Sequence, residues 1–206
     1  MAVNGKEIEV KFYIPNLQAI ESKLKTLGAW LDQPRIYEIN LRFDTRNGDL
    51  CRQYRVLRLR QDTRTRLTYK GPGIIEDGAR AREELELTVS DFDTAKALLE
   101  ALGYEVVVMY EKYRTTYTFE GLIITLDEMP YGNFIEIEGP NGNSIRDTAH
   151  LLDLDWEERI NESYLVLFER IRTAMGLTFR DLSFDNFRGV SVSPLLFRIL
   201  AKGSVP

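Results

Sequence analysis

Cysteine and histidine are nearly absent from this chain of 206 residues, which contains one of each, Cys51 and His150. A single cysteine excludes a disulfide within the chain and a cysteine-based zinc site, and it suits a reducing compartment. A single histidine excludes a metal site built from several histidines and leaves few routes to a Ser-His-Asp triad. Any metal or catalytic chemistry must therefore rest on carboxylates, lysines and arginines.

Long apolar runs are also missing. No stretch approaches the roughly 18 to 20 apolar residues that a membrane-spanning helix needs. The N-terminus, MAVNGKEIEVKF, lacks the apolar core of a signal peptide, so we expect a cytoplasmic protein that does not act at a membrane. With 27 basic and 32 acidic residues the net charge is −5, which argues against general binding to nucleic acid. A homodimer is left open.

Strands with a charge at every second position dominate the sequence. In residues 7–12 (EIEVKF) the acids and the lysine share one face, while Ile8, Val10 and Phe12 share the other. The alternation recurs in VLRLR (56–60), REELEL (82–87), EKYR (111–114) and FIEIE (134–138). About seven strands of this kind, separated by turn sequences, predict a mainly antiparallel β structure.

Two helices are predicted within this β pattern. One apolar stripe covers 17–27 and ends at Gly28. Another covers 92–102, follows a candidate cap at Asp91 or Ser90 and ends at Gly103. Each stripe follows a strand with Glu-x-Glu. The chain therefore either repeats one β-α unit or carries two similar amphipathic helices by chance.

Further helices are predicted over 144–152 and from about residue 162 to residue 175. Residues 177–206 show no clear period. We expect one domain over 1–176, followed by an extension that is either packed over the body or a mobile tail. The segment 74–81, after a Gly-Pro-Gly turn, is a candidate lid.

The charged strands can be arranged in two ways. An open sheet or sandwich would leave the charges in water, where each cross-strand ion pair contributes less than about 1 kcal/mol. A closed barrel would place the charges in its bore and the apolar face outward under helices. The charge distribution favours the barrel, because acids share some strands (7/9, 136/138) and bases share others (58/60, 112/114). Such clusters favour a divalent cation and a phosphate, respectively, and so predict a site for a metal-bound polyphosphate.

The ordered set of motifs resembles that of a known family, the CYTH superfamily of triphosphate tunnel metalloenzymes. Glu7-x-Glu9-x-Lys11 is similar to the family's ExExK signature, and the likeness continues in order over about residues 6–170. The wording EIEVKF, LTYKGP and EKYRTTY looks most like the branch of class IV adenylyl cyclases and thiamine triphosphatases. The resemblance implies an α+β fold, an eight-stranded antiparallel β-barrel with helices packed outside, that binds a triphosphate and needs Mg²⁺ or Mn²⁺.

The resemblance also implies roles for individual residues. The metal ligands that it implies are Glu7, Glu9, Asp127, Glu136 and Glu138. The substrate-binding bases that it implies are Lys11, Arg58, Arg60, Lys70, Arg82, Lys112 and Arg114. The residues that it places in the catalytic step are Glu7, Glu9, Lys11 and Lys70.

Three functions stay open at this point. The first is a metal-dependent phosphohydrolase acting on tripolyphosphate, a nucleoside triphosphate or thiamine triphosphate. The second is a class IV adenylyl cyclase, which converts ATP to cyclic AMP and pyrophosphate. The third is a non-catalytic module that binds polyphosphate or a nucleotide, and the complete set of acids argues against it. Hydrolysis is placed slightly ahead of cyclisation, because a bound triphosphate and a water suffice for it.

Overall fold

The computed structural model describes residues 5–201. Its strands are β1 (Lys6–Tyr13), β2 (Trp30–Thr45), β3 (Val56–Gln61), β4 (Thr65–Lys70), β5 (Ile74–Glu76), β6 (Ala79–Val89), β7 (Tyr104–Phe119), β8 (Leu122–Met129) and β9 (Gly132–Glu138). Its helices are α1 (Leu17–Thr26), α2 (Asp49–Arg52), α3 (Phe92–Ala101), α4 (Gly142–Leu151), the short 3₁₀ turn η1 (Trp156–Glu158), α5 (Tyr164–Met175) and α6 (Pro194–Ala201).

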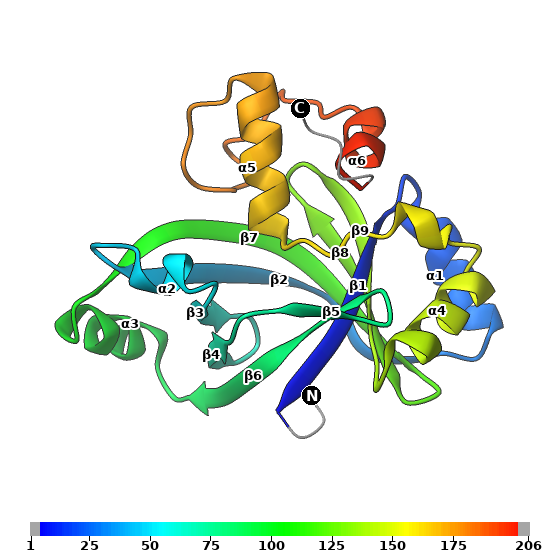
Figure 1. Cartoon of the computed structure of the whole chain (residues 1–206), viewed down its shortest axis with the longest axis horizontal. Helices are drawn as coiled ribbons and strands as arrows, with labels where there is room; N and C mark the ends of the chain where they lie inside the picture. The colour runs from blue at the N-terminus through cyan, green and yellow to red at the C-terminus, as the bar shows by residue number, and fades with distance from the viewer. Residues whose placement is uncertain (1–4, 202–206) are drawn as a thin grey trace.

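The strands close into a barrel (Figure 1). Each strand pairs with the next in the order β1-β9-β8-β7-β2-β3-β4-β6, and β6 returns to pair with β1. The ring therefore contains eight strands, all antiparallel to their neighbours, while β5 is an extra strand paired with β6. The closed barrel predicted from the charge pattern is confirmed.

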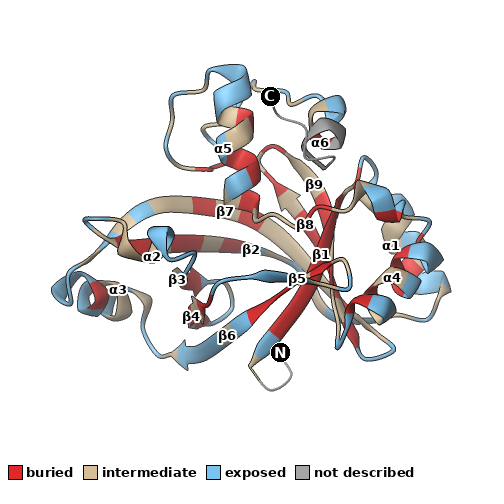
Figure 2. Ribbon diagram, in the orientation of Figure 1, coloured by how far each residue is buried: buried red, intermediate tan, exposed pale blue. Residues whose placement is uncertain are grey.

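On β1, β8 and β9 both faces of the barrel are largely buried, for different reasons, whereas the second half of β6 is exposed (Figure 2). The outward side chains Val10 and Ile137 are fully buried in a hydrophobic cluster with Leu24 of α1 and Ile145 of α4. On another part of the ring, Leu59 packs in the same way with α3. The alternate residues point into the bore and carry the charges, as the period of two predicts.

The two predicted β-α units have similar structures. Asn16 caps α1 and Asp91 caps α3, and each side chain accepts a hydrogen bond from a backbone N–H of the first turn. Gly28 and Gly103 follow these helices with φ of +82° and +89°, a conformation that favours glycine. Each helix leads into a strand of 16 residues, and these two strands, β2 and β7, pair with each other. A common origin of the two units stays a prediction.

A C-terminal layer covers one end of the barrel (Figure 1). An aromatic cluster joins the barrel to this layer and contains Tyr131, Phe134, Tyr164, Phe168 and Phe187. Leu182 also exchanges backbone hydrogen bonds with Met109 and Glu111 of β7. The extension thus packs over the body as far as it is described, whereas the domain boundary at residue 176 stays a prediction.

The expectation of a lid over 74–81 is not met. This segment is a hairpin, and the Gly78 carbonyl at its tip accepts hydrogen bonds from Arg159 Nε (3.2 Å) and Asn161 Nδ2 (3.3 Å). The hairpin is therefore fixed to the segment that follows α4, and its residues do not belong to the lining of the cavity described below.

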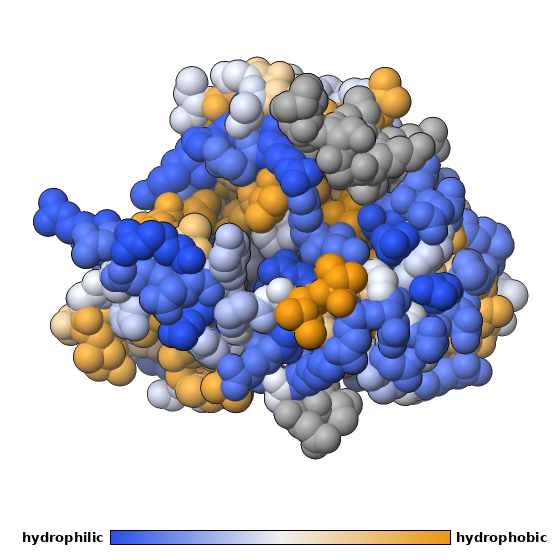
Figure 3. All heavy atoms as spheres, in the orientation of Figure 1, coloured by the Kyte–Doolittle hydropathy of each residue, from blue (hydrophilic) through white to orange (hydrophobic). Residues whose placement is uncertain are grey.

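The face of the molecule in Figure 3 is mainly hydrophilic. A hydrophobic group stands out over β5, where Ile74 and Ile75 are 63% and 61% exposed. Among the described residues, no helix is both long enough and apolar enough to cross a membrane.

Gly142→Ala should detach the hairpin tip from α4. A Cβ at Gly142 would lie 2.6 Å from the Cβ and 2.7 Å from the carbonyl oxygen of Asp77, and backbone atoms cannot yield cheaply. We expect the free energy of unfolding, measured with urea, to fall by about 1–3 kcal/mol. Asn143→Ala, at the exposed next position, is the control. Equal stability of the two variants would contradict this packing argument.

Candidate functional site

The barrel encloses a cavity of about 720 Å³ lined by charged side chains. Acidic residues in the lining include Glu7, Glu9, Glu38, Glu84, Glu86, Glu136 and Glu138. Basic residues in the lining include Lys11, Arg42, Arg58, Arg60, Arg66, Lys70, Arg82, Lys112 and Arg114. The structure therefore brings together every site residue predicted from the sequence except Asp127, which is not in the lining.

One side of the cavity, the acidic wall, consists of Glu7 and Glu9 on β1, Glu84 on β6, and Glu136 and Glu138 on β9. The Glu7 carboxylate accepts hydrogen bonds from Lys70 Nζ (2.6 Å) and Arg82 Nε (2.7 Å). Burial alone would raise the pKa of Glu7, but these two cations lower it far below its usual value. The carboxylate is therefore ionised at neutral pH.

Glu136 and Glu138 differ in their partners. Glu136 lies 3.2 Å from Lys11 Nζ and 3.5 Å from Arg114, which keep its pKa well below the usual value in spite of its burial. Glu138 forms no ion pair within the described part of the chain. Its pKa is raised to about 7 by burial and by repulsion, first from Glu7 and then from other acids of the wall. A bound cation would relieve this repulsion.

Asp127 lies outside the cavity lining and is fully buried. Its carboxylate accepts two hydrogen bonds of 2.6 Å from Arg114, one of 3.1 Å from Lys112 and one of 2.7 Å from the Tyr164 hydroxyl. Both oxygens are thus occupied by protein donors. Asp127 thus holds the two cations that face the cavity, and one of them, Arg114, also lies 3.5 Å from Glu136. The role of Asp127 as a metal ligand stays a prediction.

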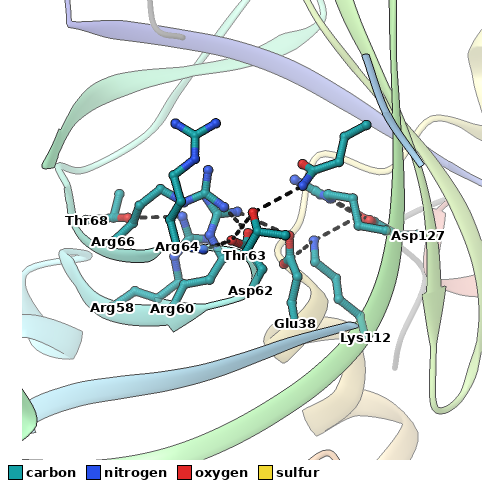
Figure 4. A network of polar contacts seen from close by, with 12 residues as sticks. Glu38, Arg58, Arg60, Asp62, Thr63, Arg64, Arg66, Thr68, Lys112 and Asp127 are labelled. Atoms are coloured by element: carbon teal, nitrogen blue, oxygen red, sulfur yellow. Dashed lines mark hydrogen bonds and ion pairs between the residues drawn. The ribbon is translucent and has the colours of Figure 1, made fainter. Parts of the chain in front are cut away.

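The opposite side, the basic wall, consists of Arg42 on β2, Arg58 and Arg60 on β3, and Arg66 on β4. Figure 4 shows the arginines of β3 and β4 on one side of the bore, opposite Asp127. Arg60 lies 3.2 Å from Glu86, and Arg58 donates to Thr68 Oγ1 at 3.2 Å.

These arginines retain donors without a partner. The Nε atoms of Arg58, Arg60 and Arg66 are buried and have no hydrogen-bond partner among residues 5–201. Burial is the main cause of the lowered pKa of Arg60, and repulsion from Arg58 is the second. The basic wall thus has donors and positive charge available for an anion.

Sequence analysis missed the contribution of β2. Glu38, Asn40 and Arg42 alternate with Ile39 and Leu41, so the same period of two was present there. Glu38 is 1% exposed and lies 3.6 Å from both Arg60 and Lys112 (Figure 4). Burial would raise its pKa, but neighbouring cations, Lys112 foremost, lower it far below the usual value.

Tyr164, the first residue of α5, was also missed. Its ring centroid lies 5.5 Å from Lys11 Nζ and 5.4 Å from Lys112 Nζ, and its hydroxyl donates to Asp127. The ring therefore lines the end of the cavity that the C-terminal layer covers. The apolar stripe of this helix predicts packing, and no sequence signal distinguishes Tyr164 from the residues that only pack.

The acidic wall fits a divalent cation by the chemistry of its donors. Glu7 shares a hydrogen bond with Glu84, and Glu9 shares one with Glu136, so carboxyl groups adjoin in pairs. Oxygen-only donors of this kind suit Mg²⁺ or Mn²⁺. Over residues 5–201, no three acidic side chains already form an assembled metal site. The carboxylates form ion pairs with lysines and arginines instead, and a bound metal ion would have to replace these pairs.

Comparison with known proteins matches a family described as CYTH domain to residues 5–163. A curated protein named "Putative adenylate cyclase" from Methanocaldococcus jannaschii is 28% identical over 134 residues, which are 64% of this chain and 75% of that protein.

Solved structures show the same fold. A crystal structure of a "putative adenylate cyclase" from Vibrio parahaemolyticus has a TM-score of 0.72 at 22% identity, covering 79% of this chain and 97% of that one. The PH1819 protein of Pyrococcus horikoshii has a TM-score of 0.66 at 27% identity, covering 80% of this chain and 99% of that one. With its barrel, its charged bore and a family match over most of its length, the chain belongs to the CYTH domain family.

Proposed function

We propose that this protein is a divalent-metal-dependent phosphohydrolase acting on a triphosphate bound in the bore of the barrel. The observation that carries the proposal is the opposition of the acidic wall and the basic wall across one cavity inside the barrel. A metal ion and a phosphate chain complement these two walls. An anion-binding module has no need for the acidic wall, and a module that binds only a cation has no need for the basic wall.

Glu7, Glu9, Glu136 and Glu138 would hold the metal ion. When bound, a divalent ion shields phosphate oxygens and lowers the pKa of a bound water. Lys70 now pairs with Glu7, and Lys11 pairs with Glu9. Once an ion neutralises these acids, both lysines are free to bind phosphate.

The cations opposite the acids orient the phosphate chain. Arg58 and Arg60 face it from β3, while Lys112 and Arg114 face it from β7, where Asp127 fixes both. Arg82 spans Glu7 and Glu9 and would contact the chain from β6. Such preorganised positive charge stabilises the negative charge that develops on a leaving phosphate oxygen.

The second candidate function is adenylyl cyclase, with the ribose 3′-hydroxyl of ATP as the nucleophile and pyrophosphate as the leaving group. The name of the Methanocaldococcus relative favours it. The same walls serve either reaction, because the outcome depends on which phosphorus lies near the metal.

Incubation with Mg²⁺ or Mn²⁺ and ATP, tripolyphosphate or thiamine triphosphate tests the proposal directly. Release of orthophosphate supports hydrolysis. Cyclic AMP with pyrophosphate would replace the proposal with the cyclase, and the absence of any product would leave a binding module.

Glu138→Gln should distinguish the effect of this carboxylate on metal-free stability from its effect on metal binding. In metal-free protein the raised pKa of Glu138 means that ionisation opposes folding. Wild-type stability should therefore fall as pH rises from about 4.5, the unfolded value, to about 7. Because glutamine does not ionise, we expect the variant to melt higher than wild type at pH 8 in EDTA and equally at pH 4.

Added Mn²⁺ should reverse this order, since only the wild type gains the full stabilisation by a bound ion. The variant should also lose most activity. Glu105→Gln, at an exposed position on β7 outside the cavity lining, is the control. Near-wild-type turnover and an equal Mn²⁺ shift in Glu138→Gln would exclude Glu138 as a metal ligand.

Arg60→Ala should separate phosphate binding from folding. Removal of Arg60 relieves its repulsion by other arginines and also loses its ion pairs with Glu86 and Glu38, so ligand-free stability should stay unchanged or rise slightly only if the repulsion equals or exceeds the attraction. Tripolyphosphate affinity should fall about tenfold or more. Calorimetric titration and thermal melting give the two quantities, with exposed Arg188→Ala as the control. Strong destabilisation with unchanged affinity would make Arg60 a structural partner of Glu38.

A further inference from the structure

Arg42 is an enclosed cation that forms no ion pair within the described part of the chain. The other enclosed bases of the lining have acidic partners, such as Glu86 for Arg60 and Asp127 for Arg114. Arg42 has none, although it lines the same cavity and its Nε atom is buried without a hydrogen-bond partner. An enclosed charge without a partner is costly to a fold, so this position calls for an explanation.

The neighbour of Arg42 on β3 makes the cost greater. Arg42 lies directly opposite Arg58 in the β2–β3 ladder. Side chains in such a pair start about 4.5–5.5 Å apart, and like charges at this distance are destabilising. Burial and repulsion by Arg58 lower the pKa of Arg42 to about 10. Arg58 has an acidic neighbour, Glu86, at 3.6 Å, whereas Arg42 has no acidic partner among the described residues, so the pair keeps one uncompensated positive charge.

Tyr110 of β7 faces the same two arginines. It is 7% exposed, lines the cavity and belongs to the aromatic cluster that closes this end of the barrel. Burial would raise the pKa of its hydroxyl, yet the pKa is lowered because Arg58, Lys112 and Arg42 favour a negative charge there. A negative group at this point would gain from all of these cations.

Unpartnered polar atoms are concentrated on this part of the basic wall. Asn40, which lies between Glu38 and Arg42 on β2, is fully buried behind the cavity lining, and both its amide atoms have no hydrogen-bond partner within the described part of the chain. Arg58 Nε is also buried without a hydrogen-bond partner among the described residues. Native structures rarely leave buried polar groups unpaired, and the unpaired Nε atoms of Arg42 and Arg58, which both line the cavity, indicate a place where a ligand supplies the partners.

We propose that Arg42 and Arg58, with the hydroxyl of Tyr110, form a phosphate-binding subsite that receives a terminal phosphate of the polyphosphate chain. It lies at the end of the cavity that the C-terminal layer covers, so the chain enters with that phosphate first. Two guanidinium forks can each give paired hydrogen bonds to one phosphate group. This inference rests on the proposed function only in taking a polyphosphate as the ligand.

The test compares Arg42→Gln with Arg46→Gln, which removes an equal charge from an exposed position just after β2. Calorimetric titration with tripolyphosphate in Mg²⁺ should show at least tenfold weaker binding for Arg42→Gln and less than twofold change for Arg46→Gln. Without ligand, Arg42→Gln should melt at or above the wild-type temperature, because a repulsive pair has been removed.

Arg42→Lys distinguishes the contribution of the positive charge from that of the guanidinium geometry. It keeps the charge and loses the fork, so it should recover part of the affinity. Unchanged tripolyphosphate binding in Arg42→Gln would overturn the subsite, and so would a large drop in ligand-free melting temperature that Arg42→Lys fully restores. Binding is measured without turnover, so a wild-type protein that binds tripolyphosphate through Arg42 and hydrolyses nothing would refute the proposed function alone.

Discussion

Charges can be enclosed in a protein only where each one gains a partner that offsets its lost hydration, and the interior of this barrel depends on that constraint. Glu7 meets it through Lys70 and Arg82, so that side chains on β1, β4 and β6 are joined across the bore as well as along the backbone ladder. Among the enclosed charges of the cavity lining that the structure describes, the pairing is incomplete at two places. Glu138 remains on the acidic wall and Arg42 on the basic wall, and each marks a position where a ligand of opposite charge gains most.

The fold was largely predictable because a period of two is a strong signal for a strand when one face is apolar and the other carries clustered charges. Val10 and Ile137 had to pack under helices, and the clustering of like charges on the other face favoured a closed bore over an open sheet. The helices followed from their apolar stripes and from glycines at their ends. The C-terminal layer was not predictable, because its packing depends on scattered aromatics such as Phe187, which have no period and find their partners only in three dimensions.

The sequence predicted most of the residues that form the site, but it predicted less well what each of them does. Motifs identified the charged strands, but they could not show that Asp127 has both oxygens occupied by Arg114, Lys112 and Tyr164. A role of this kind depends on distances across the bore, which sequence spacing does not contain. Glu38 was missed for a different reason: its strand mixes an acid, an amide and an arginine, and so lacks the like-charge clustering that identified the other strands.

The position of β1 between β6 and β9 has a consequence for biosynthesis. The first strand of the chain completes the ring only by pairing with a strand that ends at Glu138, so the barrel cannot close until that residue has left the ribosome. Contacts of such long sequence separation form slowly, and the unpaired edges are exposed in the meantime. The acids on β1 then have a second effect, because a charged edge resists association with other nascent chains. The acids on β1 lose hydration when the barrel closes. Before closure, the same acids reduce association with other chains.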